Sequence, residues 1–258
     1  MIDHQRPPAE PQNAPPVLDP VAAYALWAAD YPPYAHNPFM QAEERALLSL
    51  LPTDLRQCRV LDAGCGSGRY ILHALQRGAV QVVGVDLSVE MLTRARVALH
   101  SAEATWRQDT AARQRGPGAR GLGYCLRASL DSIPVHDAWA DLTLCGLTLG
   151  HLEDLHAGLA ELCRITRPGG VLLCSDLHPM NRTLGWRREF TAAGQRYAVR
   201  HTWHLYSTWQ DVCQALGLRI MRVLEPRLDP ADIPAGARFD VTALEVPVAL
   251  VFELRRDR

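Results

Sequence analysis

The order of apolar and polar positions divides the middle of the chain into alternating strands and helices. Short apolar runs that are typical of buried strands lie at Arg59–Asp62, Val80–Asp86, Ala140–Cys145 and Val171–Asp176. Between them, apolar residues recur every three or four positions, which predicts helices over Arg69–Arg77, Val89–Ser101 and Leu152–Thr166. Ser88 stands where a helix N-cap is expected. Repeated strand–helix units with short connections predict a doubly wound α/β fold, in which helices cover both faces of a parallel sheet.

The first fifth of the chain has a different pattern. Residues 1–20 contain six prolines, and we expect a disordered lead-in there. Residues 21–51 predict helical pieces that are interrupted by prolines. The clearest of these is the amphipathic helix Met40–Leu51, which ends before Pro52.

Two segments complete the predicted single domain, which spans residues 21–258. The Arg- and Gly-rich stretch Asp109–Gly123 predicts a long surface loop. The apolar run Val246–Arg255 predicts a final strand.

Composition excludes several classes of partner. The formal net charge is −1 and no block of like charge occurs, so neither nucleic acid nor an anionic membrane is the expected partner. Mean hydropathy is −0.10, and no apolar run is long enough to span a bilayer. The N-terminus lacks the apolar core of a signal peptide, so we expect a cytoplasmic protein.

Cysteine and lysine usage narrows the chemistry further. The seven cysteines are scattered without a C-x-x-C pair, which favours reduced core thiols over disulfides or a zinc site. All 27 basic residues are arginine. The absence of lysine excludes a pyridoxal phosphate Schiff base, a P-loop lysine and a lysine general base.

The strongest local motif follows the first predicted strand. Residues Val60–Tyr70 read VLDAGCGSGRY, with a strand, then Asp62, then a glycine-rich turn into a helix. Glycines allow a sharp turn and close approach to a ligand, and the helix N-terminus offers free N–H groups. A carboxylate two positions before the first glycine would repel a pyrophosphate and would pair with an ammonium group. A glycine-rich turn without a ligand is the alternative interpretation.

A second acidic residue supports a nucleoside site. Asp86 ends the second predicted strand, where doubly wound nucleotide sites place a carboxylate that accepts the ribose hydroxyls. Taken alone, Asp86 is equally well explained as a helix cap. In register with Asp62 and the glycines, the binding interpretation is favoured.

These motifs resemble those of the class I methyltransferases that use S-adenosylmethionine (SAM), of the small-molecule type. The resemblance covers about residues 40–180 and implies a mainly parallel seven-stranded sheet whose last strand, here Val246–Arg255, is antiparallel. Ser129 stands where this family usually carries Asp. The cofactor contacts that the resemblance implies are Asp62, Gly64, Cys65, Gly66, Gly68, Asp86, Leu87, Met91, Ser129, Leu130 and Cys145.

Methyl transfer from a sulfonium is an in-line displacement, so the enzyme mainly aligns the nucleophile and excludes water. A general base is needed only when the acceptor must lose a proton. The candidates are His151, His178 and His36, and a structural histidine is the alternative for each. We expect residues 21–51 to form a helical lid and residues 180–210 a substrate-side insert.

Two further groups of side chains leave alternatives open. His201 and His204 are spaced like metal ligands, but no third ligand cluster is evident, so no metal site is expected. Aromatic residues either wall a pocket for a flat acceptor or pack the lid and insert against the core. They are Tyr24, Trp27, Tyr31, Tyr34, Phe39, Trp186, Phe190, Tyr197, Trp203, Tyr206 and Trp209.

The sequence therefore predicts a SAM-dependent methyltransferase that acts on O, N or C of a small metabolite, as a monomer or homodimer. A Rossmann-type NAD(P)-dependent oxidoreductase is one alternative. Asp62 and the missing lysine of a Tyr-x-x-x-Lys pair oppose it. A non-catalytic SAM-binding protein is a second alternative, and a protein or RNA methyltransferase, weakened by the neutral charge, is a third.

Overall fold

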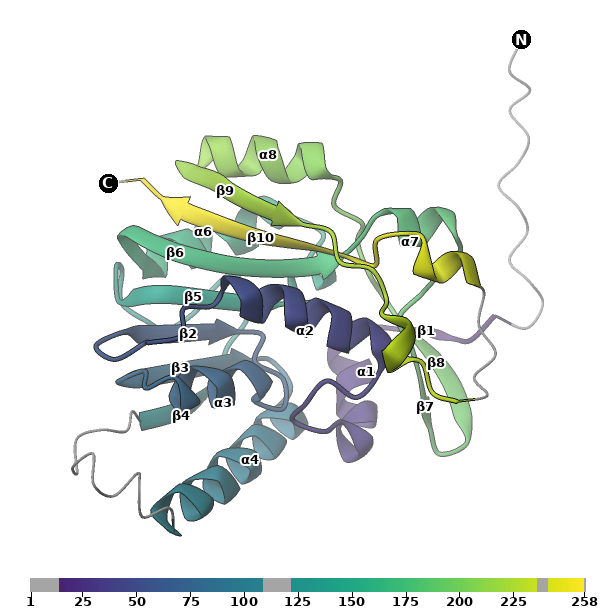
Figure 1. Cartoon of the computed structure of the whole chain (residues 1–258), viewed down its shortest axis with the longest axis horizontal. Helices are drawn as coiled ribbons and strands as arrows, with labels where there is room; N and C mark the ends of the chain where they lie inside the picture. The colour runs from purple at the N-terminus through teal and green to yellow at the C-terminus, as the bar shows by residue number, and fades with distance from the viewer. Residues whose placement is uncertain (1–13, 109–121, 236–240, 258) are drawn as a thin grey trace.

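A seven-stranded sheet forms the centre of the computed structural model, which describes residues 14–108, 122–235 and 241–257 (Figure 1). The strand order is β4-β3-β2-β5-β6-β10-β9. β10 is antiparallel to both of its neighbours, and the other strands run parallel. The predicted doubly wound fold with an antiparallel last strand is confirmed. The strands are β2 (Arg59–Ala63), β3 (Gln81–Asp86), β4 (Leu122–Arg127), β5 (Ala140–Gly146), β6 (Thr166–Leu177), β9 (Leu218–Leu224) and β10 (Ala249–Arg256).

Helices cover both faces of this sheet. In Figure 1, α2 (Pro38–Leu50), α3 (Arg69–Gln76) and α4 (Val89–Gln108) lie in front of it. On the other face lie α6 (Leu155–Ile165) and α8 (Tyr206–Ala215).

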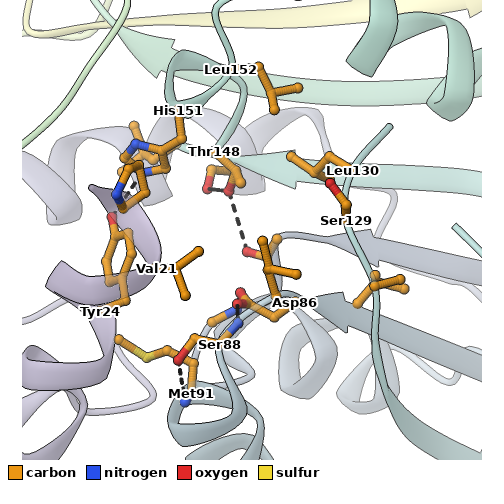
Figure 2. A pocket seen from close by; sticks show the side chains of 18 of the residues that line it. Val21, Tyr24, Asp86, Ser88, Met91, Ser129, Leu130, Thr148, His151 and Leu152 are labelled. Carbon is orange, nitrogen blue, oxygen red and sulfur yellow. Dashed lines mark hydrogen bonds between the residues drawn. The ribbon is translucent and has the colours of Figure 1, made fainter. Parts of the chain in front are cut away.

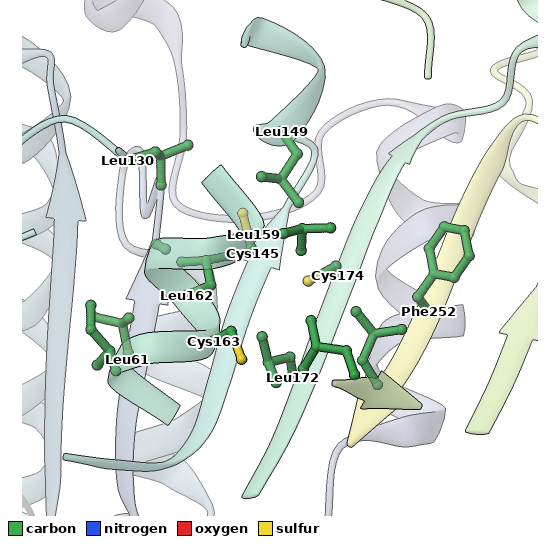
Figure 3. Close-up of a cluster of buried hydrophobic side chains, with 14 of the residues drawn as sticks. Leu61, Leu130, Cys145, Leu149, Leu159, Leu162, Cys163, Leu172, Cys174 and Phe252 are labelled. Carbon is green, nitrogen blue, oxygen red and sulfur yellow. The ribbon is translucent and has the colours of Figure 1, made fainter. Parts of the chain in front are cut away.

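The two core clusters show how the strands serve both faces. Val60 packs with the cluster that holds residues of α2 and α3, and its neighbour Leu61 packs with the cluster under α6 and α8. Figure 3 shows this second cluster, with Leu159 and Leu162 of α6 beside the sheet. Because successive side chains of a strand point to opposite faces, central strands that are covered twice appear as continuous apolar runs.

Several predicted boundaries differ from the structure. Most of the predicted loop Asp109–Gly123 lies outside the described residues, and its last two residues belong to β4, so the prediction is wrong there. β4 is an edge strand without a fully buried residue, and it directly follows the Arg- and Gly-rich stretch, so the start of the strand has no clear sequence signal. α4 continues past Ser101 to Gln108, and α6 begins only after its N-cap Asp154.

A second, three-stranded sheet joins distant parts of the chain. β1 (Val17–Leu18) pairs in parallel with β8 (Gln195–Val199), which forms a hairpin with β7 (Glu189–Ala192). Residues 1–13 lie outside the described residues. The prediction of a disordered lead-in is wrong for its end, because β1 is paired and α1 (Pro20–Trp27) begins at Pro20.

α1 packs directly on this hairpin. Ala23 shares a buried cluster with Phe190 and Val199, and the Trp27 ring stacks on the Phe190 ring at 4.9 Å. The segments predicted as lid and insert are therefore packed together. Short helical turns complete the described chain: η1 (Ala28–Asp30), η2 (Leu149–His151), α7 (Met180–Thr183), η3 (Pro230–Asp232) and η4 (Val241–Leu244).

The seven cysteines are all free, and five of them are buried. None of the helices in the described ranges combines the length and the apolar character needed to cross a membrane.

Candidate functional site

A cavity of about 240 Å³ lies where the carboxyl ends of the central strands meet α1 (Figure 2). Its floor comes from the loops after β2, β3, β4 and β5, and its roof from α1 and the segment before β7. β2 lies between β3 and β5, so the chain reverses its direction of winding at this point, where open α/β sheets bind ligands. The lining side chains labelled in Figure 2 are Val21, Tyr24, Asp86, Ser88, Met91, Ser129, Leu130, Thr148, His151 and Leu152.

Two glycines shape the loop after β2 in different ways. Gly64 has φ +70°, and a Cβ there would lie 2.3 Å from Cγ2 of Thr148. The Thr148 hydroxyl donates to the Gly146 carbonyl at 2.9 Å, so Gly64 leaves room for the loop after β5. Gly66 has φ +52°, and a Cβ there would meet no atom within 4 Å. Gly66 therefore leaves space in the cavity itself.

Asp86 ties the loops after β2 and β3 together. Its Oδ2 accepts the Gly66 N–H at 2.8 Å, and its Oδ1 accepts the Ser88 N–H at 2.9 Å. Each oxygen keeps a further lone pair for a ligand hydroxyl. Burial raises the pKa of the Asp86 carboxyl. Ser88 Oγ accepts the Met91 N–H at 3.2 Å, which confirms Ser88 as the cap of α4.

Asp62 is a buried carboxylate that lacks a hydrogen-bond partner within the described chain. Both of its oxygens are enclosed, and burial raises the pKa of this carboxyl to about 7. It does not line the cavity, although Gly64, two residues later, does. The Arg69 charge and the Ile71 N–H lower the pKa of Asp62 but do not offset its burial. A ligand cation in contact with the carboxylate would favour its ionised form further.

The other predicted cofactor contacts divide into two groups. Leu87, Met91, Ser129 and Leu130 line the cavity. Cys65, Gly68 and Cys145 do not: Cys65 packs in the core with α3, Gly68 precedes α3, and Cys145 belongs to the cluster under α6 (Figure 3). The loop after β5 reaches the cavity through the three lining residues Gly146, Leu147 and Thr148.

Of the three candidate bases, His151 alone lines this cavity. Its Nε2 lies 3.0 Å from the Tyr24 hydroxyl, and its Nδ1 lies 3.3 Å from the Arg200 carbonyl oxygen. A carbonyl only accepts, so Nδ1 carries the proton and Nε2 accepts from Tyr24. Burial lowers the pKa of His151 to about 3, and the Arg188 charge adds to this. His151 is therefore neutral, and its lone pair is engaged.

The other two histidines lie elsewhere. His178 Nε2 is 3.1 Å from Glu225 Oε1, and its Nδ1 accepts the Met180 N–H. His36 packs edge-on against Tyr31, with ring centroids 5.1 Å apart, and burial lowers its pKa. The structure does not bring these two side chains to the cavity.

Arg188, the cation of the cavity roof, is not among the residues that the sequence predicts for the site. Its Nη2 donates to the Tyr31 hydroxyl at 3.2 Å, and its Nη1 donates to the Leu147 carbonyl at 3.3 Å. Its guanidinium lies 5.4 Å from the centroid of the Tyr24 ring. Arg188 has no motif around it and lies far along the chain from the glycine-rich loop, so no sequence signal marks it.

Metal ligation has no support in the described ranges, where no three His, Cys, Asp or Glu side chains group closely enough to hold an ion. His204 Nε2 instead lies 3.1 Å from the Leu152 carbonyl oxygen, and His201 Nε2 lies 3.3 Å from Asp176 Oδ1.

Comparison with known sequences identifies a methyltransferase domain over residues 61–174. Curated relatives include malonyl-[acyl-carrier protein] O-methyltransferases from Enterobacter lignolyticus and Salmonella typhimurium. The first is 33% identical over 163 residues, which cover 63% of this chain and 56% of the relative. The second is 35% identical over 157 residues, which cover 60% of this chain and 52% of the relative. The chain thus spans about half the length of these relatives.

A solved S-adenosylmethionine-dependent methyltransferase from Mesorhizobium loti has a similar fold. The TM-score is 0.61 at 27% identity, and the match covers 83% of this chain and 98% of that chain. Together the comparisons show a methyltransferase domain and the fold of a SAM-dependent methyltransferase, in line with the motifs around Asp62 and Asp86.

Proposed function

We propose that the chain is a class I SAM-dependent methyltransferase and that it transfers the methyl group of SAM to an oxygen atom of a small-molecule acceptor. The observation that carries this proposal is the position of Asp86. Its carboxylate is fixed by two backbone N–H groups on the cavity lining and keeps lone pairs for ribose hydroxyls.

The residues around Asp86 suit the rest of the donor. Leu87, Met91 and Leu130 offer apolar surface for the adenine, and Ser129 offers a hydroxyl for its amino group. Gly66 leaves open space beside them. The orphaned carboxylate of Asp62 suits the ammonium group of the methionine part.

On the roof side of the cavity, the protein can align the acceptor with the methyl group and exclude water. When bound, SAM supplies a methyl group on a positively charged sulfur, so the leaving group needs no protonation. Tyr24, Tyr31 and Arg188 close the cavity from the roof. His151 is neutral and its lone pair is occupied by Tyr24, so it is a poor general base. This arrangement suits an acceptor oxygen that is already ionised.

The names of the relatives support oxygen as the methylated atom, and they make a malonyl thioester on an acyl-carrier protein one candidate acceptor. The chain spans only about half of those proteins, so their acceptor need not be its own. We therefore test the malonyl thioester together with free small acids, phenols and alcohols as candidate acceptors. A segment of 21–51 that acts as a lid, and a segment of 180–210 on the substrate side, are part of this proposal.

The test begins with calorimetry of SAM and of S-adenosylhomocysteine (SAH), with NAD as the competing ligand. Labelled SAM is then offered with the acceptor panel, and the product bond is identified by mass spectrometry. Micromolar binding of SAH and a labelled O-methyl product support the proposal. Tight NAD binding without SAH binding would restore the oxidoreductase alternative, and SAH binding without transfer to any acceptor would favour a SAM-binding protein.

A further inference from the structure

A second cavity of about 490 Å³ adjoins the cofactor cavity at the roof. Four aromatic side chains line it, with aliphatic residues between them: Trp27, Phe39, Trp186 and Trp203. We call it the aromatic cavity. Among the described residues that line the two cavities, Arg188 alone lines both.

Arg188 is a cation without a carboxylate partner in the described part of the chain. A guanidinium has five N–H donors, and the Leu147 carbonyl and the Tyr31 hydroxyl accept one each. Its Cζ atom lies 5.4 Å from the centroid of the Tyr24 ring and 5.8 Å from that of the Trp27 ring. These cation–π contacts compensate only part of the hydration that the guanidinium loses. A cation in such surroundings is stabilised strongly by a bidentate anion.

Neither of the two nearby acidic side chains supplies that anion. Glu189 pairs with Arg196 at 2.6 Å. Asp176 Oδ1 lies 3.3 Å from His201 Nε2 and accepts the Leu177 N–H at 2.8 Å. Burial raises the pKa of this carboxyl to about 7. The donor groups of Arg188 that remain free are therefore available to a ligand.

We propose, building on the proposed function, that the acceptor is a carboxylic acid with an apolar body. Its carboxylate binds Arg188, and its apolar body occupies the aromatic cavity. Arg188 supplies a positive charge where the two cavities meet, and most of the lining of the aromatic cavity is aromatic or aliphatic, which matches an amphipathic acid in both parts. The other polar residues of that lining are Asn37, Asn181, Arg187 and Glu189.

The reaction balances without a base. A carboxylate oxygen forms a bond to the methyl carbon as the carbon–sulfur bond breaks, and the electron pair of that bond stays on sulfur. The products are a methyl ester and neutral SAH. No proton moves, which agrees with the engaged lone pair of His151.

The test uses the full chain saturated with SAH and measures acid binding by calorimetry. The ligands are butyrate, octanoate, 3-phenylpropionate and octanamide. We expect octanoate and 3-phenylpropionate to bind more tightly than butyrate, because of the apolar body, and octanamide to bind at least about tenfold more weakly than octanoate, because it lacks the charge.

The variants are Arg188→Gln and the control Arg222→Gln. Arg222 lies on β9 and lines neither cavity, and it pairs with Glu253 at the surface. Arg188→Gln should weaken octanoate about tenfold or more, keep the preference for octanoate over butyrate, and change SAH affinity less than twofold. Arg222→Gln should change none of these. Thermal unfolding checks that both variants fold.

The outcomes separate the two proposals. If SAH itself does not bind the unaltered chain, the proposed function fails. If SAH binds but neither octanoate nor 3-phenylpropionate does, only this inference fails. If Arg188→Gln weakens SAH about tenfold and leaves acid binding unchanged, Arg188 holds the carboxylate of the methyl donor, and the inference is overturned.

Discussion

The Tyr24 hydroxyl lies 3.0 Å from Nε2 of His151 and donates to it. This hydrogen bond joins α1, near the start of the described chain, to the turn after β5. His151 is fixed on its other side by the Arg200 carbonyl, just past β8. One imidazole therefore connects the roof, the hairpin and the edge of the main sheet.

Tyr24→Phe should lower the free energy of unfolding by about 1 kcal/mol, because it leaves the buried Nε2 lone pair of His151 without a donor. Urea unfolding measures the change. Tyr197→Phe is the matched control, since its hydroxyl meets only the exposed Gln195 at 3.0 Å. Equal stability of the two variants would show that the Tyr24–His151 bond contributes little.

His151→Ala should reduce turnover and spare SAH affinity, because it removes the partner that orients Tyr24 on the cavity roof. His178→Ala is expected to keep turnover, since His178 pairs with Glu225 outside the cavity. Steady-state kinetics and calorimetry give both quantities. A loss of turnover in His178→Ala would contradict this placement of the two histidines.

Asp86→Ala should weaken SAH binding by roughly 1–3 kcal/mol, through the loss of charge-assisted hydrogen bonds to the ribose. The SAH affinity of Asp86→Asn should fall between those of the unaltered protein and Asp86→Ala, because asparagine keeps one acceptor oxygen. Calorimetry measures the affinities, with the exposed Asp131→Ala as control. Unchanged affinity in Asp86→Ala would disprove the ribose assignment.

The binding of SAH should tighten as pH rises from about 6 to 8. Burial raises the pKa of Asp62 to about 7, so the free protein carries this carboxyl protonated at low pH and ionised at high pH. The ammonium group favours the ionised form, and binding at pH 6.5 therefore releases a proton. Calorimetry in buffers of different ionisation enthalpy detects the release.

The control for this pH dependence is Asp62→Asn, which has no proton to lose. Its SAH affinity should be lower at pH 8 and nearly independent of pH. A pH profile that is the same in both proteins would assign the proton to another group, such as Asp176, whose pKa burial also raises to about 7.

Alanine at the two glycines should separate folding from binding. Gly64→Ala places a methyl group 2.3 Å from Thr148 and should destabilise the fold by about 2 kcal/mol or more, with partial recovery in Gly64→Ala/Thr148→Gly. Gly66→Ala meets no protein atom and should cost about 1 kcal/mol of backbone strain, yet weaken SAH strongly. Thermal unfolding and calorimetry distinguish the two effects, and equal stability losses would contradict them.

The floor of the site was predictable because its residues are close together in the sequence. Gly64, Gly66 and Asp86 stand at strand ends whose apolar runs and glycine spacing carry the signal. Cys145 shows the limit of that signal: it points into the core, and the chain reaches the cavity one residue later, at Gly146. The alternation of a strand covered on both faces does not reveal which residue faces the ligand.

The segments of the roof were predicted as the lid 21–51 and the insert 180–210, but the contacts that join them were not, because they are long-range. Tyr24 reaches His151 across more than a hundred residues, and Arg188 is placed by a small hairpin with an exposed turn. Neither residue lies in a motif with its own spacing. The aromatic residues have both of the roles that the sequence left open, lining a pocket and packing the core. Tyr24 and Tyr31 line the cofactor cavity, while Trp209 is fully buried in the core.

The parallel pairing of Val17 with Ala198 has a consequence for how the protein assembles. Closing so long a stretch of chain is entropically unfavourable until the main sheet has brought its ends together. We therefore expect the main sheet to form first, and β1, α1 and the β7–β8 hairpin to pack on it last. Mild denaturant should then release these three elements before the main sheet unfolds.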